Sequence, residues 1–232
     1  QGLAAAQAFL PGTTRSGGGI ANIAALKSMA RLPGTAQELA AMRTALGAEP
    51  ASVITGQQAT ETNVRKAKLS DARIVALATH GLMAGEIQGA AEPGLVFTPP
   101  DAASEVDDGL LTASEVAGLK LDADWVILSA CNTAAGDGSE GAPGLSGLAR
   151  AFFYAGARNL LASHWPVRDD VAAKMTVRTI EIARDNPALS RAEAFALAMR
   201  EIRNDASQDS DSDTLAHPNA WAPFTLIGDG AR

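Results

Sequence analysis

The sequence predicts an α/β fold in which a mostly parallel sheet lies between helices in a three-layer sandwich. Short apolar runs bounded by turn residues recur along the chain, as at 125–129 and 159–163, and such runs are typical of buried parallel strands. Segments with helical periodicity separate these runs, and this alternation implies βαβ units with helices on both faces of the sheet. With 232 residues the chain is long enough to form one domain with a sizeable core.

The beginning of the chain differs in composition from the rest. Residues 1–34 are rich in alanine and glycine and include a run of glycines, so this stretch is expected to be a linker. The folded domain is expected to cover residues 35–232. It opens with a capping box, in which Thr35 and Glu38 would satisfy backbone N–H groups of a helix that Gly47 then ends.

The remaining elements follow from the same two kinds of pattern. Strands are expected at 52–55, in the run from 74 to the residue before His80, and at 95–97, 110–111, 125–129, 159–163 and 221–227. Helices are expected at 60–68, 145–154 and 171–184, and after capping boxes at 112–115 and 190–193. The pieces at 95–97 and 110–111 are expected to pair as a small hairpin.

Two of the predicted strands end at residues that support covalent chemistry. The strand at 125–129 leads to Cys131, the only cysteine in the chain, and the strand that starts at Ile74 leads to His80. Open α/β sheets bind ligands beyond the carboxyl ends of their strands. Because cysteine attacks as the thiolate and needs a neighbouring base, Cys131 and His80 are the expected nucleophile and base.

The motifs around these two residues resemble a known family. They read ATHG, LSACNTA, GLARAFFYAGA and SHWPV in that order, and over residues 32–229 the chain resembles the CHAT family of caspase-like peptidases. The two catalytic motifs of that family, an HG pair and an SAC triplet, are intact at His80 and Cys131. Caspases place their histidine about 50 residues before the cysteine, and the separation here is 51 residues.

The resemblance implies a caspase-like fold and a cysteine endopeptidase. Cys131 would attack the scissile carbonyl, His80 would protonate the leaving amine, and the amides of Gly81 and Cys131 would form the oxyanion hole. It implies a protein or peptide substrate, no metal and no cofactor. Bacterial relatives often fuse this domain to tetratricopeptide repeats, so a regulatory repeat region or activating partner is also implied, with a domain that is incomplete at its N-terminus.

Acidic residues near the cysteine predict which side chain is preferred at the cut. Asp137 and Glu140 lie in the loop after Cys131, and Asp108 lies on the connection before it. A partly desolvated carboxylate gains most from a guanidinium group, so cleavage is expected after Arg, or less well after Lys. The alternative is that these acids only solvate a surface loop.

Other signals leave alternatives open. His164 also follows a predicted strand and is a second candidate base, a pocket-lining residue or a structural residue, whereas His217 is expected in a surface turn. The glycines Gly136, Gly138 and Gly141 match the spacing of a dinucleotide-binding loop, but they begin too far past the strand for its tight turn. The alternative function is a non-catalytic, caspase-like interaction module that works by binding.

Composition narrows the function classes further. The net charge of −7 argues against a broad nucleic-acid-binding surface. Arg150 and Arg158 interrupt the longest apolar region, so no membrane span is expected. One cysteine forms no internal disulfide, which favours the reducing cytoplasm, and the histidines show no zinc-ligand spacing.

Overall fold

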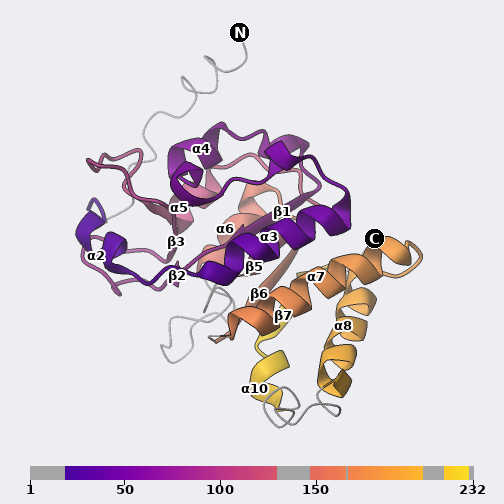
Figure 1. Ribbon diagram of the computed structural model, residues 1–232. Helices are drawn as coiled ribbons and strands as arrows, with labels where there is room; N and C mark the ends of the chain where they lie inside the picture. Colours follow the sequence, from indigo (N-terminus) through magenta and orange to yellow (C-terminus); the bar gives the residue numbers. More distant parts are fainter. Residues whose placement is uncertain (1–18, 130–146, 166, 206–216, 230–232) are drawn as a thin grey trace.

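The computed structural model describes residues 19–129, 147–165, 167–205 and 217–229, and a four-stranded sheet lies at its centre (Figure 1). The strand order is β1-β5-β6-β7, formed by Ile74–Ala78, Trp125–Ser129, Asn159–Ser163 and Phe224–Gly228. Strands β1, β5 and β6 are parallel to one another, and β7 pairs with β6 in the antiparallel sense. The predicted α/β fold with a mostly parallel sheet is confirmed.

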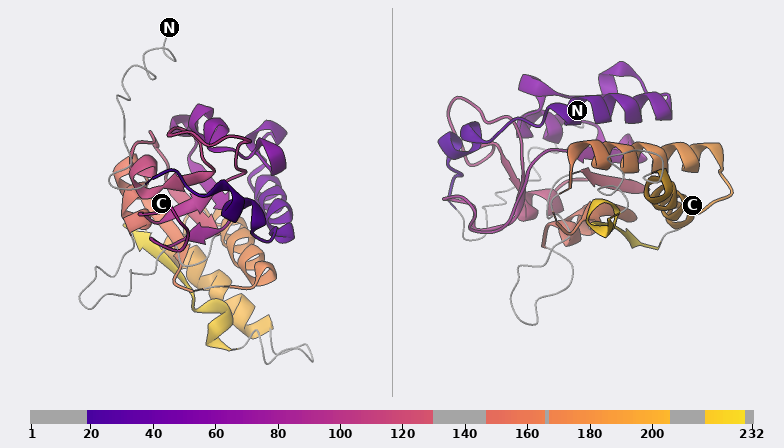
Figure 2. Two further views of the ribbon diagram at one scale, coloured as in Figure 1. Left: turned by 90° about the vertical axis from the view of Figure 1, so that its left-hand side faces the viewer. Right: turned by 60° about the horizontal axis from the view of Figure 1, so that its bottom comes forward.

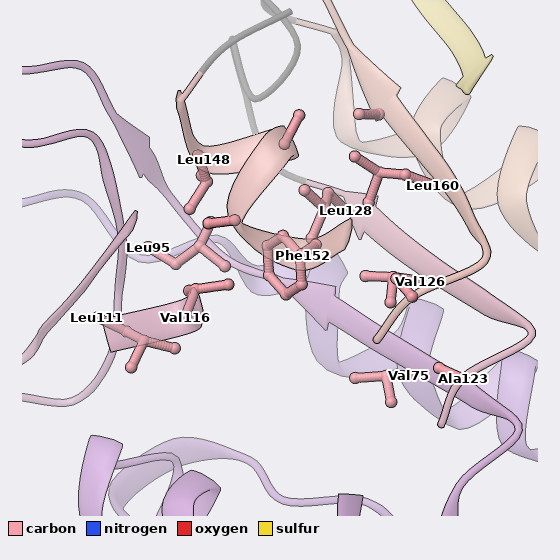
Figure 3. Close-up of a cluster of buried hydrophobic side chains, with 14 of the residues drawn as sticks. Val75, Leu95, Leu111, Val116, Ala123, Val126, Leu128, Leu148, Phe152 and Leu160 are labelled. Carbon is pink, nitrogen blue, oxygen red and sulfur yellow. The ribbon is translucent and has the colours of Figure 1, made fainter. Parts of the chain in front are cut away.

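Successive side chains of β5 face opposite sides of the sheet, as strand geometry requires. Val126 and Leu128 belong to a buried cluster in which helix α6 contributes Leu148 and Phe152 (Figure 3). Trp125 belongs to a second cluster on the other face, which helices α3, α7 and α8 complete. These helices are α6 (Gly147–Ala155), α3 (Pro33–Leu46), α7 (Asp169–Asp185) and α8 (Arg191–Asp205). Helices therefore cover both faces, with α3 and α7 in front of the strands and α6 behind them in Figure 1.

A second, smaller sheet lies beside the first. Its order is β2-β3-β4, formed by Gly81–Leu82, Gly94–Val96 and Leu110–Thr112, and all its pairs are antiparallel. The predicted hairpin is thus confirmed. Helix α2 (Ile23–Ser28) packs against this sheet through Leu26. Figures 1 and 2 show α2 and the small sheet at one end of the molecule, away from α8.

Most of the predicted helices are confirmed. The helices predicted at 60–68, 145–154 and 171–184 correspond to α4 (Glu61–Lys66), α6 and α7. The predicted capping boxes open α5 (Ala113–Ala117), through Thr112 and Glu115, and α8, through Ser190 and Glu193. None of the helices in the described part of the chain is long and apolar enough to cross a membrane.

The capping box predicted at Thr35 is wrong. Helix α3 begins two residues earlier, at Pro33, and its N-cap residue Leu32 makes no side-chain capping bond. Proline suits the first helical position because its φ is already helical and its missing N–H has no partner to lose. The helix does end at Gly47, whose φ of 63° lies in the left-handed region that glycine adopts without strain.

Two strand predictions also change. Residues 52–55 form no strand, because a 3₁₀ turn at Pro50–Ser52 directs the backbone N–H of Val53 to the carbonyl of Pro50. At the end of the chain, Trp221 closes the short helix α10 (Pro218–Trp221), and β7 starts only at Phe224.

Candidate active site

The candidate site lies where β1 and β5 end. In their parallel pairing Ala78 is opposite Ser129, so both chain segments leave the sheet at the same edge. His80 follows Ala78 by two residues, and Cys131 follows Ser129 by two residues. Cys131 itself lies outside the described residues. The two strands that lead to His80 and Cys131 therefore end at the same edge of the sheet, as the sequence predicts.

His80 is held by backbone groups from two directions. Its ring nitrogen Nε2 lies 2.7 Å from the carbonyl oxygen of Ala30, on the connection between α2 and α3. Its own carbonyl accepts the N–H of Val96 in β3 at 2.9 Å. The hydroxyl of the preceding Thr79 donates to the carbonyl of Val96. These bonds fix both the backbone and the ring of His80.

The bond to Ala30 also determines the tautomer of His80. A carbonyl oxygen only accepts hydrogen bonds, so Nε2 must carry the proton. In the neutral ring the lone pair is then on Nδ1. That nitrogen is the atom with which His80 can accept a proton.

Gly81 begins β2 and is paired with Leu95 of β3. Because Gly81 directly follows His80, its amide lies at the same end of β1 as His80. The second amide of the expected oxyanion hole belongs to Cys131, which lies outside the described residues, as do Asp137 and Glu140.

A cavity of about 390 Å³ opens beside His80. Thr79 and His80 line one side of it, and the basic residues Lys27 of α2 and Arg31 of the α2–α3 connection line another. No aspartate or glutamate belongs to the described lining of this cavity. Lys27 is partly neutralised by Asp101 at 3.7 Å. This cavity can receive part of an extended substrate next to the candidate base.

Asp108, expected in the substrate pocket, has a structural position instead. Its side chain has no exposed surface. One carboxylate oxygen accepts the N–H of Ala21 at 2.5 Å, and the other accepts the N–H of Leu110 at 3.0 Å. The carboxylate thus joins the start of the described chain to β4, and its burial leaves it no surface for a substrate.

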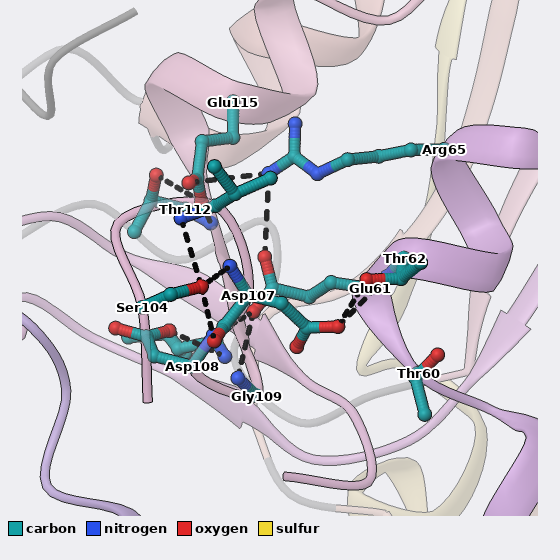
Figure 4. Close-up of polar contacts among 12 residues, drawn as sticks. Thr60, Glu61, Thr62, Arg65, Ser104, Asp107, Asp108, Gly109, Thr112 and Glu115 are labelled. Atoms are coloured by element: carbon teal, nitrogen blue, oxygen red, sulfur yellow. Dashed lines mark hydrogen bonds and ion pairs between the residues drawn. The ribbon is translucent and has the colours of Figure 1, made fainter. Parts of the chain in front are cut away.

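A polar network that local patterns did not reveal holds the turn next to Asp108 (Figure 4). Glu61 of α4 accepts the N–H groups of Asp108 and Gly109 at 2.9 and 2.7 Å. Arg65 lies 3.3 Å from Glu61 and 3.1 Å from Glu115, which is also buried. Burial, followed by the charge of Glu115, raises the pKa of Glu61 to about 7.

The other two histidines differ in position. His164 follows β6, which lies on the opposite side of β5 from β1, and its backbone N–H donates to the carbonyl of Pro223 at 2.9 Å. Because β5 and β6 are parallel, His164 lies at the same edge of the sheet as His80. His217 is an exposed N-cap residue whose Nδ1 accepts the N–H of Asn219 at 3.1 Å.

Two contributors to the site were missed in the sequence. One is the carbonyl of Ala30, for which a sequence offers no signal because every residue carries this group. The other is Glu38, which is buried and whose carboxylate reaches Ser129, the last residue of β5. Its side chain matched a local capping pattern, so its distant partner was not expected.

The family model described as the CHAT domain matches residues 12–229. Tetratricopeptide repeat protein 28 of Mus musculus is 29% identical over 231 aligned residues, which cover 87% of this chain and 9% of that protein. Tetratricopeptide repeat protein 28 of Homo sapiens is 32% identical over 123 residues, which cover 53% of this chain and 4% of that protein. The chain therefore spans less than a tenth of the length of these relatives.

Proposed function

The chain belongs to the CHAT domain family, a caspase-like family, and we propose that it is a cysteine endopeptidase in which Cys131 and His80 form a catalytic dyad. The observation that carries this proposal is the hydrogen bond from Nε2 of His80 to the carbonyl of Ala30 at 2.7 Å. It leaves Nδ1 as the proton acceptor of a ring that lies at the same sheet edge as the end of the cysteine strand.

The proposed reaction uses protein groups alone. Nδ1 of His80 takes the proton of the Cys131 thiol, and the thiolate attacks the scissile carbonyl carbon to form a tetrahedral intermediate. The amides of Gly81 and Cys131 donate to its oxyanion. The imidazolium then protonates the leaving amine, and a C–N bond breaks as a thioester remains. Water, deprotonated by His80, hydrolyses this thioester and regenerates the thiol.

The Ala30 carbonyl has a further role in this mechanism. When His80 becomes an imidazolium, the Nε2–H···O bond becomes charge-assisted and therefore stronger. The carbonyl thus stabilises the charged ring in the step that generates the thiolate, and it holds the ring in one orientation throughout.

For specificity, the proposal keeps cleavage after Arg or Lys. Its support is Asp137 and Glu140 in the sequence that follows Cys131, without any contribution from the buried Asp108. Lys27 and Arg31 line the cavity beside His80 and could instead bind an acidic side chain of the substrate. Preference for such a side chain is therefore the competing outcome of the test. A peptide library with Arg, Lys or Asp before the cut decides between them, and Asp137→Asn and Glu140→Gln should reduce the preference for Arg.

We also propose how the activity of this domain is controlled and in which compartment it acts. The relatives are repeat proteins by name and are much longer than this chain, which supports a repeat region or partner that controls activity. The chain would act in the reducing cytoplasm, where a lone thiol stays reduced.

The experiment is a screen of a complex peptide mixture, with cleavage products identified by mass spectrometry, for the wild type, Cys131→Ala and His80→Ala. Cleavage by the wild type that both variants lose supports the dyad. Stable binding of peptides without cleavage by any of the three proteins would instead identify the domain as a non-catalytic interaction module.

A further inference from the structure

Glu38 is a buried carboxylate that the proposed reaction does not use. It lies in α3 and is 3% exposed. Its Oε2 accepts the hydroxyl of Ser129 at 2.9 Å, and its Oε1 accepts the hydroxyl of Thr176 at 2.7 Å. Ser129 is the last residue of β5, and Thr176 belongs to α7. One side chain therefore links two helices to the end of the cysteine strand.

The environment makes these bonds strong. Thr176 is 1% exposed, and Ser129 is partly buried. Hydrogen bonds to a carboxylate are stronger than those between neutral groups, and a low dielectric strengthens them further. A buried carboxylate is also costly when it loses its partners. The position of Ser129 is therefore firmly determined by α3 and α7.

The same part of the chain also holds the base. The Ala30 carbonyl that binds the ring of His80 comes just before α3, and Glu38 lies within that helix. The stretch from Ala30 to Glu38 thus contacts His80, two residues after β1, and Ser129, the last residue of β5. Residues 33–38 of this stretch belong to α3, so the same helix start connects the two contacts.

We propose that Glu38 is a positioning residue for Cys131, acting through the hydroxyl of Ser129 to set where the chain leaves β5 relative to His80. This inference rests on the proposed dyad, because its expected effect is on the pairing of thiolate and imidazolium. Removing the anchor frees the last residue of β5, so the point at which the chain leaves the sheet is no longer fixed relative to His80. The thiolate then loses the stabilisation that a nearby imidazolium provides.

The test measures the alkylation rate of Cys131 by iodoacetamide against pH. Because the chain has one cysteine, the label reports this residue alone. A free thiol has its midpoint near pH 8.5, and a thiol paired with a cationic histidine has a lower midpoint. In the wild type we expect the lower midpoint. In Ser129→Ala and Glu38→Ala the midpoint should rise towards 8.5, with a rate at pH 6 about 10-fold lower.

A matched pair on α7 separates positioning from general stability. Thr176→Val removes the hydroxyl that fixes Glu38, whereas Thr179→Val removes a hydroxyl that bonds to the carbonyl of Met175 in the same helix at 2.6 Å. Both threonines are fully buried or nearly so. We expect Thr176→Val to raise the alkylation midpoint and Thr179→Val to keep the wild-type value. Glu38→Gln, which retains the size and one acceptor oxygen, should give a midpoint between those of the wild type and Glu38→Ala.

Each outcome is decisive once thermal unfolding confirms that a variant is folded. A wild-type midpoint that Ser129→Ala and Thr176→Val both retain would overturn the role of Glu38 while leaving the dyad in place. An equal rise in Thr176→Val and Thr179→Val would also overturn it, because the effect would then be loss of packing. A wild-type midpoint near 8.5 would remove the dyad itself, and this inference with it.

Discussion

The ends of β1 and β5 are held by different kinds of chemical group. After β1, the ring and backbone of His80 bond to backbone atoms of Ala30 and Val96. At the end of β5, the hydroxyl of Ser129 bonds to the side chain of Glu38, which in turn bonds to Thr176. A substitution can delete a side-chain anchor outright, whereas a backbone carbonyl stays in place whatever residue carries it. The histidine end should therefore tolerate changes in its neighbours better than the cysteine end.

The largest expected effect comes from the histidine itself. His80→Ala should lower kcat/KM by about 10²- to 10⁴-fold, the usual contribution of a general acid–base residue. His164→Ala is the matched control, because this histidine follows the other neighbour of β5, and it should keep activity within a few-fold of wild type. Steady-state kinetics on one cleaved peptide measures both. Loss of activity in His164→Ala alone would transfer the role of base to the β6 side.

The second effect concerns the buried polar network at the turn before β4. Arg65 is the cation between the buried Glu61 and Glu115, and Arg65→Met should lower the free energy of unfolding by about 3–5 kcal/mol because it leaves buried carboxylates without their charge partner. Arg178→Met is the control: Arg178 also pairs with two glutamates, but at the surface. It should lose about 1 kcal/mol or less. Urea unfolding at neutral pH separates the two, and equal losses would contradict a special role for the buried network.

The network also predicts how stability depends on pH. The pKa of Glu61 is about 7 in the fold against 4.5 as its ordinary value, chiefly because of burial. The folded state therefore binds this proton more tightly, so the contribution of Glu61 is fully present below pH 4.5 and is lost as the pH rises through 7. The change is at most about 3 kcal/mol. Glu61→Gln should flatten this dependence in urea unfolding between pH 5 and pH 8, whereas Glu105→Gln, at an exposed acid on the connection between β3 and β4, should keep it. An unchanged slope in Glu61→Gln would assign the dependence to other groups.

The sheet was largely predictable from the sequence because its signal is local. The runs that form β1, β5 and β6 are apolar and bounded by turn residues; β5 and β6 are almost wholly buried in the structure, whereas β1 is mostly half-buried. The proposed pair was also found locally, since both residues follow such runs. What local patterns missed is long-range: Glu38 bonds to residues 91 and 138 positions away. A pattern of Thr and Glu three residues apart looks like a capping box whether or not the glutamate is needed elsewhere.

Asp108 shows the same limit from the other direction. In the sequence it stands in a polar stretch next to Asp107 and therefore looked available to a substrate. In the fold, backbone N–H groups of Ala21 and Leu110 converge on it. Leu110 is only two residues from Asp108, but Ala21 becomes its neighbour only when α2 and the residues just before it pack against the small sheet. An acid that serves a distant amide cannot be distinguished in sequence from an acid that faces solvent.

The smallest effect tests the backbone anchoring most directly. Thr79 supplies a side-chain bond near His80, from its hydroxyl to the carbonyl of Val96. Thr79→Val keeps the shape and removes that bond, which should lower the free energy of unfolding by about 1 kcal/mol. Because the bonds of His80 to Ala30 and Val96 are formed by backbone groups and its own ring, kcat should stay within about 3-fold of wild type, a change of less than about 1 kcal/mol in the barrier. Thermal unfolding and kcat are measured beside Ser129→Ala, which removes the corresponding hydroxyl at the other strand end. If Thr79→Val reduced kcat as much as Ser129→Ala did, the two strand ends would be equally dependent on side chains, and the contrast between them would be wrong.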